Sequence, residues 1–402
     1  MSRPVVSVVI AAYNAQEYVG QTIRSVLAQS LDSLELIVVN DGSTDGTGEV
    51  IRRFAGDRRV RVMDQQNAGC AAARNRGAAQ AQGDFISIVD ADDVCWPKKL
   101  ERQVDCFVSE PRLAVVGTHA RMIDDEGRHL GVLRTPTDPL EIREGMKESM
   151  QFCHATVMIR SEVYRQMGGY EESYPTSEDY EFLRRIVERH RASNVDEVLY
   201  DMRIHGGNKS FYFFEQQRLR NLLTRHLMEE GRTFDEQARR EFEGQLSREQ
   251  LIAAGVSAQR IDRQMVSNYV HRVQMLDLLG KREDADDFLE RAKAYVSRHG
   301  LGSSSRAELC ALRSLRAMRQ RRWGRCVAEL LGGLLLDSSV VGQRYKESAR
   351  FALHRWYTLR ALDLTNGPNH STSGRRSHST GRVASLPFPL RDRPIFCGQR
   401  GR

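Results

Sequence analysis

The sequence lacks patterns that mark several common classes of protein. Its seven cysteines are scattered, and none forms a Cys-x-x-Cys pair, which argues against a zinc site and against a disulfide framework. No apolar run approaches the ~20 residues of a membrane span. The residues after Met1 lead into a predicted strand rather than a signal peptide. We therefore expect a cytoplasmic protein.

Glycine is missing from a position where two nucleotide-binding classes need it. Residues 11–16, directly after the first predicted strand, read Ala-Ala-Tyr-Asn-Ala-Gln. A dinucleotide dehydrogenase would carry Gly-x-Gly-x-x-Gly there, and a sugar nucleotidyltransferase would carry a glycine-rich phosphate loop. The sequence disfavours both classes.

Most of the positive charge lies near the carboxyl end of the chain. The net charge is +7, and residues 364–402 hold seven arginines and one aspartate, so the remainder carries only +1. A nearly neutral body does not indicate nucleic-acid binding. We expect this Ser-, Gly-, Pro- and Arg-rich tail to be disordered. Peripheral contact with anionic lipid on the inner face of the cell membrane remains an alternative for it.

The length of the chain, 402 residues, predicts more than one domain. In residues 1–210 strand patterns alternate with helix patterns. This predicts an α/β fold with a doubly wound, mostly parallel sheet and ligands at the carboxyl ends of its strands. Residues 211–363 show helical periodicity, which predicts an all-α domain and a candidate surface for protein contacts.

Three carboxylates follow an apolar run that reads as a buried strand. Residues 85–89 read Phe-Ile-Ser-Ile-Val, and Asp90, Asp92 and Asp93 come directly afterwards. Side chains alternate along a strand, so Asp90 and Asp92 should project to the same side. An acidic turn is the ordinary alternative. Two converging carboxylates also suit Mg²⁺ or Mn²⁺ bridging to a phosphate.

Three later segments carry expectations about local structure. Residues 121–150 loosen into turns, a variable surface of the kind that selects a second substrate. Residues 152–159 read as a strand. Ser177 is placed to cap a helix that begins at Glu178.

Six segments, taken in order and spacing, resemble the family 2 glycosyltransferases, which have a GT-A fold. They are Ser-Val-Val-Ile-Ala-Ala-Tyr-Asn at 7–14, Asn-Asp-Gly-Ser-Thr-Asp at 40–45, Asn-x-Gly-x-x-x-Ala-Arg-Asn-x-Gly at 67–77, Asp-x-Asp-Asp at 90–93, Gly-Gly-Tyr at 168–170 and Glu-Asp at 178–179. The resemblance covers residues 4–210, about half of the chain. It implies a nucleotide-sugar donor, with UDP as the expected nucleotide, and Mn²⁺ or Mg²⁺ as cofactor.

The resemblance also implies a donor pocket. Ala11, Tyr13 and Asp41 match positions that surround the nucleotide base. Arg74 matches a residue that lines the nucleotide pocket, where an arginine can meet a phosphate or a base edge. Asp90 matches the residue that faces the ribose.

The remaining matches concern the metal and the chemistry. Asp92 matches the metal ligand of the family, and Asp93 and His205 are further candidates. Asp179 matches the general base of inverting enzymes. For Glu178 and Asp179 the ordinary alternative is that acids in a first helical turn are favoured by the helix dipole, at ~0.3–1 kcal/mol each. For His205 it is a solvated loop histidine.

These roles predict a hexosyltransferase of polysaccharide biosynthesis that inverts configuration in one displacement. Asp179 would take the proton from a hydroxyl of a glycan, lipid-linked or other acceptor. Processive synthases of the family carry Gln-x-x-Arg-Trp and membrane helices. Here Gln217-Arg-Leu-Arg220 is followed by Asn221, so we expect a non-processive enzyme. A catalytically inactive nucleotide-sugar-binding or scaffolding protein on the same fold is the open alternative.

Overall fold

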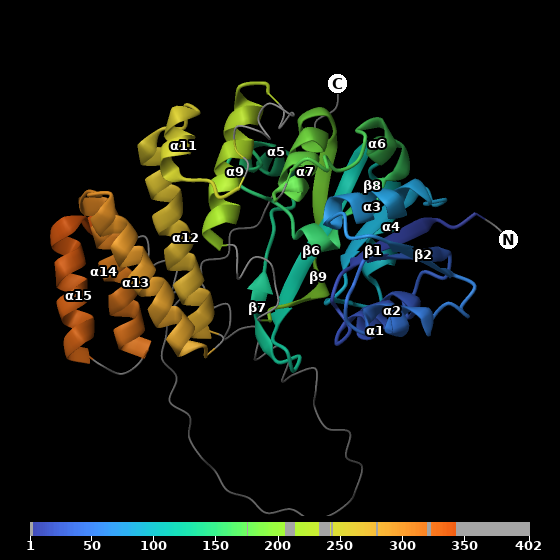
Figure 1. Ribbon diagram of the computed structural model, residues 1–402, viewed down its shortest axis with the longest axis horizontal. Coiled ribbons are helices and arrows are strands. Elements are labelled where there is room, and N and C mark those ends of the chain that lie inside the picture. Colours follow the sequence, from blue (N-terminus) through green and yellow to red (C-terminus); the bar gives the residue numbers. More distant parts are fainter. Residues whose placement is uncertain are drawn as a thin grey trace, which may run out of the picture. The chain divides into compact units, whose positions relative to one another are not determined.

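The computed structural model describes residues 3–174, 176–205, 214–232, 242, 244–278, 280–319 and 323–342 (Figure 1). The strands are β1 Val6–Ala12, β2 Leu34–Asp41, β3 Val60–Gln65, β4 Phe85–Asp90, β5 Val94–Cys95, β6 Leu113–Ile123, β7 His129–Leu133, β8 Met158–Arg160 and β9 Arg191–Arg203. The helices among them are α1 Val19–Leu27, α2 Thr47–Arg52, α3 Cys70–Ala79, α4 Lys99–Ser109, α5 Pro139–Gly145, α6 Ser161–Gln166, α7 Glu178–Arg189 and the short 3₁₀ helix η1 His154–Thr156.

The strands form one mixed sheet, in the order β3-β2-β1-β4-β8-β6-β9-β5, with β7 paired to β6. The strands β1 to β4 are parallel to one another. The register sets Ala11 of β1 opposite Asp90 of β4, and Ala12 opposite Asn40 of β2. The carboxyl ends of these three strands therefore meet at one edge, as the sequence predicted.

Helices cover both faces of the sheet, so the central strands are buried on both sides. On one face Val8 and Ile10 of β1 pack with apolar residues of α1, α2 and α4. On the other face Val9 packs with residues of α3, α6 and α7. The predicted doubly wound α/β fold is confirmed.

The prediction of a strand at residues 152–159 is wrong for the first part of this segment. Residues 154–156 form the turn η1, and β8 begins at Met158. The Gln103 side chain donates hydrogen bonds to the Val116 carbonyl at 2.7 Å and the Thr156 carbonyl at 2.8 Å. A buried amide thus takes the place of strand pairing there.

Residues 121–150 are also more regular than expected. They contain the end of β6, the strand β7 and the helix α5. Asp138 caps α5 by accepting hydrogen bonds from the Leu140 and Glu141 amides, both at 2.9 Å, and Pro139 occupies the first turn. The turn residues were visible in the sequence, but the short elements between them were not.

The second half of the described chain is helical, as predicted. Its helices are α9 Phe214–Glu229, α11 Arg248–Ala253, α12 Ala258–Leu278, α13 Arg282–Arg298, α14 Ser303–Arg319 and α15 Trp323–Leu336. Apolar side chains of α9, α11, α12, α13 and α14 share one core. Among the described residues, none of the helices combines the length and apolarity needed to cross a bilayer. The predicted boundary at residue 210 and the tail from residue 364 lie outside the described residues.

Candidate active site

Asp41, at the end of β2, forms side-chain hydrogen bonds with the loop that precedes α3. The residue is 3% exposed. It accepts hydrogen bonds from Gln65 Nε2 at 2.7 Å and from the Ala68 and Gly69 amides at 2.8 and 3.0 Å. Asp41 therefore shapes the edge of the sheet, and its predicted contact with a nucleotide base stays a prediction.

The loops that follow β1 and β2 are joined to each other. The Asn14 amide donates to Ser43 Oγ at 3.1 Å, and the Thr44 amide donates to Asn14 Oδ1 at 2.9 Å. Asn14 has a left-handed backbone, with φ of 49°. Tyr13, the residue before it, is 44% exposed. The structure thus places Ala11 and Tyr13 at the same edge, with the tyrosine open to solvent.

Arg74, in α3, connects two acids that are far apart in the sequence. Its Nη2 donates to Asp90 Oδ1 at 3.0 Å, and its Nη1 donates to Glu178 Oε1 at 3.2 Å. Its side chain is 10% exposed, and its guanidinium lies 5.5 Å from the centre of the Tyr170 ring. The end of β4 and the start of α7 are therefore held together by one buried cation.

Glu178 is kept ionised by its partners. Burial opposes its ionisation, but the positive charge of Arg74 and a hydrogen bond from Cys70 Sγ at 2.9 Å outweigh that effect and lower the pKa of Glu178. Cys70 is a contact that the sequence motifs did not indicate, because the motif at 67–77 specifies no residue type at position 70.

The pKa of Asp179, next to Glu178, is shifted in the opposite direction. Burial, followed by the negative charge of Glu178, raises the pKa of Asp179 to about 6. Its Oδ1 accepts a hydrogen bond from the Tyr180 amide at 2.7 Å. Two adjacent acids in one helical turn thus have pKa values shifted in opposite directions. That difference separates an ion-pairing acid from a candidate proton acceptor.

The prediction that the Ser177 side chain caps α7 is wrong. Ser177 is the residue before α7, but it has a left-handed φ of 74° and its side chain caps no amide of the helix. Its hydroxyl donates instead to Asn221 Oδ1 of α9. The first turn of α7 is therefore tied to the helical half of the chain.

The three metal candidates do not converge on one point. His205 Nε2 lies 2.8 Å from Asp92 Oδ2. Asp93 is 3% exposed and accepts a hydrogen bond from the Arg203 amide at 2.7 Å. Burial, and then the charges of Asp92 and Asp90, raise the pKa of Asp93 well above its ordinary value. The structure pairs Asp92 with His205 and directs Asp93 into the interior.

Arg203 positions the Asp92–His205 pair, a role that the sequence motifs did not indicate. It is 3% exposed at the end of β9. Its Nε donates to the Asp92 carbonyl at 2.9 Å, its Nη1 to the Asp124 carbonyl at 3.0 Å and its Nη2 to Gln21 Oε1 at 2.9 Å. An arginine inside a predicted strand was the only available signal, since nothing in the sequence shows which carbonyls it meets.

His154 and Tyr170 were also missed as neighbours of the site. His154 Nε2 lies 2.8 Å from the Tyr170 hydroxyl. Burial, followed by the charge of Arg74, lowers the pKa of His154 to about 4, so the ring is neutral at physiological pH. Asn75 Oδ1 accepts the Tyr170 amide at 2.9 Å. One contact thus joins Asn75 of the 67–77 motif to Tyr170 of the 168–170 motif.

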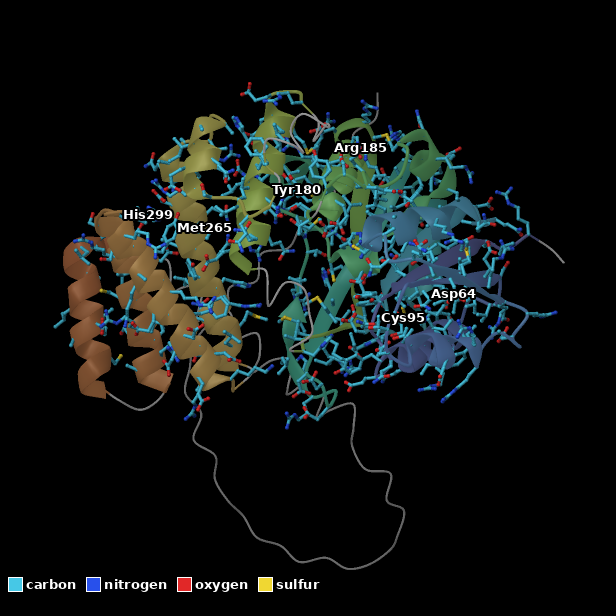
Figure 2. The ribbon with its side chains drawn as sticks, in the orientation of Figure 1. Asp64, Cys95, Tyr180, Arg185, Met265 and His299 are labelled. Atoms are coloured by element: carbon cyan, nitrogen blue, oxygen red, sulfur yellow. The ribbon has the colours of Figure 1, made fainter. Side chains whose placement is uncertain are left out.

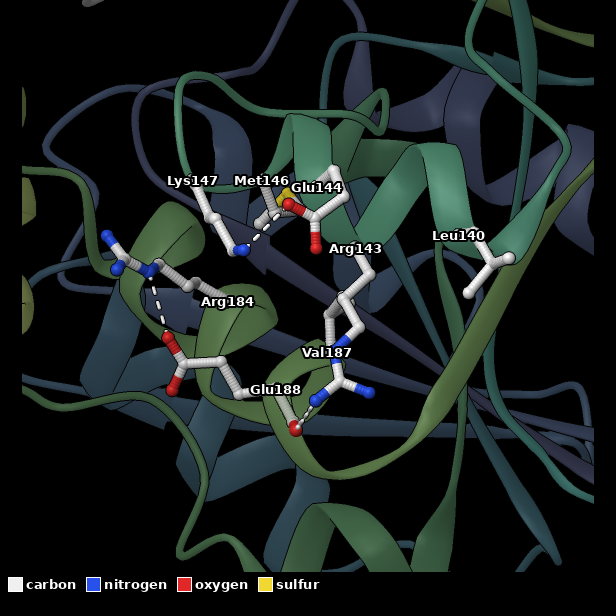
Figure 3. Close-up of a pocket in the computed structure, with 8 residues that line it drawn as sticks. All are labelled: Leu140, Arg143, Glu144, Met146, Lys147, Arg184, Val187 and Glu188. Carbon is white, nitrogen blue, oxygen red and sulfur yellow. Dashed lines mark hydrogen bonds and ion pairs between the residues drawn. The ribbon is translucent and has the colours of Figure 1, made fainter.

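A separate pocket of about 350 Å³ lies between α5 and α7 (Figure 3). It adjoins Tyr180, labelled in Figure 2, whose hydroxyl donates to the Met146 carbonyl at 2.5 Å. Three cations line it, and each has an acceptor within the pocket: Lys147 with Glu144 at 2.7 Å, Arg184 with Glu188 at 3.0 Å and Arg143 with the Glu188 carbonyl at 3.1 Å. Because each of these cations already has an acceptor within the pocket, we assign no ligand to it.

Comparison with known proteins gives a family match in the first half of the chain. Residues 7–168 match the family model described as Glycosyl transferase family 2. A Bacillus subtilis (strain 168) protein described as "Putative glycosyltransferase EpsE" is 34% identical over 209 residues, which are 50% of this chain and 74% of that protein.

Two larger proteins match over the same half. The chondroitin synthase of Escherichia coli is 30% identical over 216 residues, 54% of this chain and 31% of that protein. The hyaluronan synthase of Pasteurella multocida is 31% identical over 208 residues, 52% of this chain and 21% of that protein. This chain therefore corresponds to less than a third of either synthase.

Solved structures with a similar arrangement have low sequence identity. The crystal structure of S. aureus TarS 1-349 in complex with UDP-GlcNAc is 20% identical, with a TM-score of 0.47 over 74% of this chain and 92% of that one. The mannosyltransferase PcManGT from Pyrobaculum calidifontis, in complex with GDP-Man and Mn²⁺, is 17% identical, with a TM-score of 0.45 over 83% of this chain and 87% of that one.

Proposed function

The chain belongs to glycosyl transferase family 2, and on that premise we propose an inverting, metal-dependent, non-processive enzyme that moves one sugar from a nucleotide-sugar donor to an acceptor hydroxyl. The observation that carries the proposal is the ion-pair chain from Asp90 through Arg74 to Glu178. This ion-pair chain joins Glu178, the neighbour of the proposed base Asp179, to the end of β4, where the donor would bind. The expected acceptor is a glycan, a lipid-linked sugar or another hydroxyl compound.

The donor would lie along the carboxyl ends of β1, β2 and β4, outside the strands, where ligands of doubly wound sheets bind. In this proposal Ala11, Tyr13 and Asp41 surround the base, and Asp90 faces the ribose. Arg74 acts as the buried cation of the nucleotide pocket. The preference for UDP over other nucleotides remains a prediction, as do protein contacts of the helical half and lipid contacts of the tail.

Asp92 and His205 fit a divalent cation. A carboxylate oxygen and an imidazole nitrogen already lie 2.8 Å apart at the same edge of the sheet. In the part of the chain that the structure describes, no group of three or more His, Cys, Asp or Glu side chains is arranged for a metal. Mg²⁺ and similar ions are often held by one or two protein ligands together with substrate phosphates and water. When bound, the cation would supply positive charge against the leaving diphosphate.

Asp93 is left out of the proposed metal site. One of its oxygens accepts the Arg203 amide, and its raised pKa favours the neutral acid, which is a poor ligand. We propose instead that Asp93 anchors the loop after β4 to the end of β9, so that Asp92 and His205 face each other.

The proposed proton transfer involves Asp179 alone. A carboxylate with a pKa of about 6 is mostly ionised at neutral pH and is more basic than an ordinary aspartate. It would accept the proton of the acceptor hydroxyl while that oxygen attacks the anomeric carbon. Glu178 stays paired with Arg74 and takes no part in the transfer.

The test is release of nucleotide from UDP-GlcNAc, UDP-glucose and UDP-galactose, with GDP-mannose as the comparison, in Mn²⁺ or in EDTA. We expect slow, Mn²⁺-dependent hydrolysis of at least one UDP-sugar, faster when acceptor oligosaccharides are added and lost in Asp179→Asn. Binding of a nucleotide sugar without turnover under any of these conditions would support the inactive binding protein instead.

A further inference from the structure

We propose that His154 binds the transferred sugar of the donor, by donating a hydrogen bond from its Nδ1–H group to an oxygen atom of that sugar. The inference rests on the proposed function, since it assumes that a nucleotide sugar lies along the strand ends. It adds a residue that distinguishes the sugar from the nucleotide, and none of the six sequence motifs includes it.

Strand pairing places His154 beside the carboxyl end of β4. The antiparallel register sets Ser87 of β4 opposite Met158 of β8, and the Ile88 amide donates to the Val157 carbonyl at 2.9 Å. Because the two strands run in opposite directions, the residues before β8 lie beside the last residues of β4. His154, the first residue of η1, therefore lies at the edge of the sheet where the donor would bind.

Tyr170 connects His154 to the buried cation of the site. The Tyr170 hydroxyl lies 2.8 Å from His154 Nε2, and the centres of the two rings are 5.7 Å apart. The Arg74 guanidinium lies 5.5 Å from the centre of the same tyrosine ring. Arg74 in turn pairs with Asp90 and Glu178. Direct contacts thus link His154 to the end of β4 and to the start of α7.

The Tyr170 hydroxyl decides which nitrogen of His154 carries the proton. Burial lowers the pKa of His154 to about 4, so the ring is neutral and holds one N–H group. Tyr170 is 2% exposed, and within the described residues Nε2 is the one hydrogen-bond partner of its hydroxyl. A buried hydroxyl that donates to nothing is costly, so the hydroxyl donates to Nε2. Nδ1 then carries the proton of the ring.

The Nδ1 side of the ring is open to a ligand. In the part of the chain that the structure describes, His154 makes no other hydrogen bond. The residue is partly exposed, and Nδ1 is not among the buried polar atoms that lack a partner. A molecule that enters the site from solvent can therefore reach this N–H group.

Tyr170 is itself held firmly, which fixes the histidine in advance. Its amide donates to Asn75 Oδ1 at 2.9 Å, and its carbonyl accepts a hydrogen bond from Asn75 Nδ2 at 2.7 Å. The centre of its ring lies 4.5 Å from that of Phe182. A donor group that is already oriented loses little entropy when a ligand binds, so His154 suits selection among similar sugars.

The order of groups in a nucleotide sugar assigns the ligand. In the proposed reaction the diphosphate lies near Asp92 and the acceptor hydroxyl near Asp179, so the transferred sugar lies between them. Arg74 joins the ends of β4 and α7 across the same interval, and His154 contacts it through Tyr170. A sugar at this position offers hydroxyl oxygens, and an N-acetylated sugar also offers a carbonyl oxygen. Both kinds of oxygen accept a hydrogen bond from a neutral imidazole.

Calorimetric titration of the full chain in Mn²⁺ tests the assignment. The ligands are UDP-GlcNAc, UDP-glucose and GDP-mannose, each compared with UDP or GDP, which lack the sugar. His154→Phe keeps an aromatic ring but removes both nitrogens. We expect this variant to bind the preferred nucleotide sugar about three- to tenfold more weakly, the effect of one lost hydrogen bond, and the diphosphate within about twofold of wild type.

Two further variants accompany His154→Phe. His190→Phe is the matched control, since His190 is also a partly exposed histidine but follows the opposite end of α7 from Glu178, and it should change neither affinity. Should His154→Phe unfold by circular dichroism, Tyr170→Phe takes its place. That variant lacks a single oxygen and leaves Nε2 free to hold the proton, so it should show the same selective loss.

The position of the proton is measured independently on the wild-type chain. Nitrogen-15 NMR of a histidine-labelled sample, with His154→Phe identifying the signal, distinguishes a protonated from an unprotonated ring nitrogen. We expect the proton of His154 on Nδ1. A proton on Nε2 would overturn the proposal, because Nδ1 would then have no hydrogen to donate.

The outcomes of the titration separate the two proposals. Equal losses of diphosphate and nucleotide-sugar affinity in His154→Phe would assign a structural role to the residue. Unchanged nucleotide-sugar affinity with a raised KM for an acceptor would place His154 on the acceptor side. Either result would overturn the inference and leave the proposed function standing, whereas a wild-type chain that binds neither UDP nor GDP would count against the proposed function itself.

Discussion

Arg74 Nη1 donates a hydrogen bond to Glu178 Oε1 at 3.2 Å, across 104 positions of the sequence. The pair is largely buried, with side chains 10% and 12% exposed. Removing Arg74 would leave two acids, Asp90 and Glu178, without their shared cation, so this arginine joins the end of β4 to the start of α7. Because Glu178 neighbours Asp179, the same pair also sets the electrostatic surroundings of the proposed base.

The first prediction tests Asp179 as the base. Asp179→Asn keeps the shape and the acceptor for the Tyr180 amide but removes the proton acceptor, so turnover should fall by ~10²–10⁴. If Asp179 only stabilises the helix, the loss is at most the ~0.3–1 kcal/mol of the dipole effect. Steady-state rates and calorimetric donor affinity, measured together, distinguish the two. Wild-type turnover in Asp179→Asn would remove this residue from the mechanism.

The second prediction concerns pH. Burial raises the pKa of Asp179 to about 6, and the base acts only when ionised, so kcat/KM should fall as the pH drops through about 6. Glu178→Gln removes a neighbouring negative charge and releases the charge of Arg74, and both changes lower the pKa of Asp179. The acidic limb of this variant should therefore move to lower pH, with more activity retained than in Asp179→Asn. An unmoved limb would show that another group titrates.

The third prediction separates the two neighbouring aspartates of the loop after β4. Asp92→Asn should abolish metal-dependent donor binding while leaving the melting temperature nearly unchanged, because Asp92 is partly exposed and faces His205. Asp93→Asn should leave that binding within a few-fold of wild type, because Asn still accepts the Arg203 amide. Calorimetry with a UDP-sugar and Mn²⁺ measures both. Loss of binding in Asp93→Asn alone would restore Asp93 as the ligand.

The fourth prediction uses two adjacent glycines. Gly168 and Gly169 have φ of +78° and +75°, so an alanine at either costs roughly 1–2 kcal/mol of backbone strain. A Cβ at Gly169 would also lie 2.5 Å from Asn75 Oδ1, whereas a Cβ at Gly168 would meet nothing within 4 Å. Gly169→Ala should therefore lower the free energy of unfolding by a further ~1–3 kcal/mol. Urea denaturation of both variants measures the difference, and equal losses would contradict the contact.

Much of the fold was determined by the sequence alone. The apolar runs that became β1, β2 and β4 each end in polar residues, and alternating strands and helices leave few arrangements other than a parallel sheet with those ends at one edge. The sequence therefore predicts that Asp41, Asp90 and Asp92 lie at one edge of the sheet. The motif spacing also singled out Asp179 and His205 as candidates.

The direction of each side chain was decided only by the tertiary structure. Asp92 and Asp93 are neighbours in the sequence, yet one meets His205, 113 positions away, and the other accepts the amide of Arg203. A local pattern carries no information about such partners, because strand register and helix packing bring them together. The same holds for Ser177, which looked like a helix cap and instead contacts Asn221. Local propensity determined which segments became strands and helices, whereas desolvation and pairing between distant residues decided in which direction the pKa of each acid is shifted.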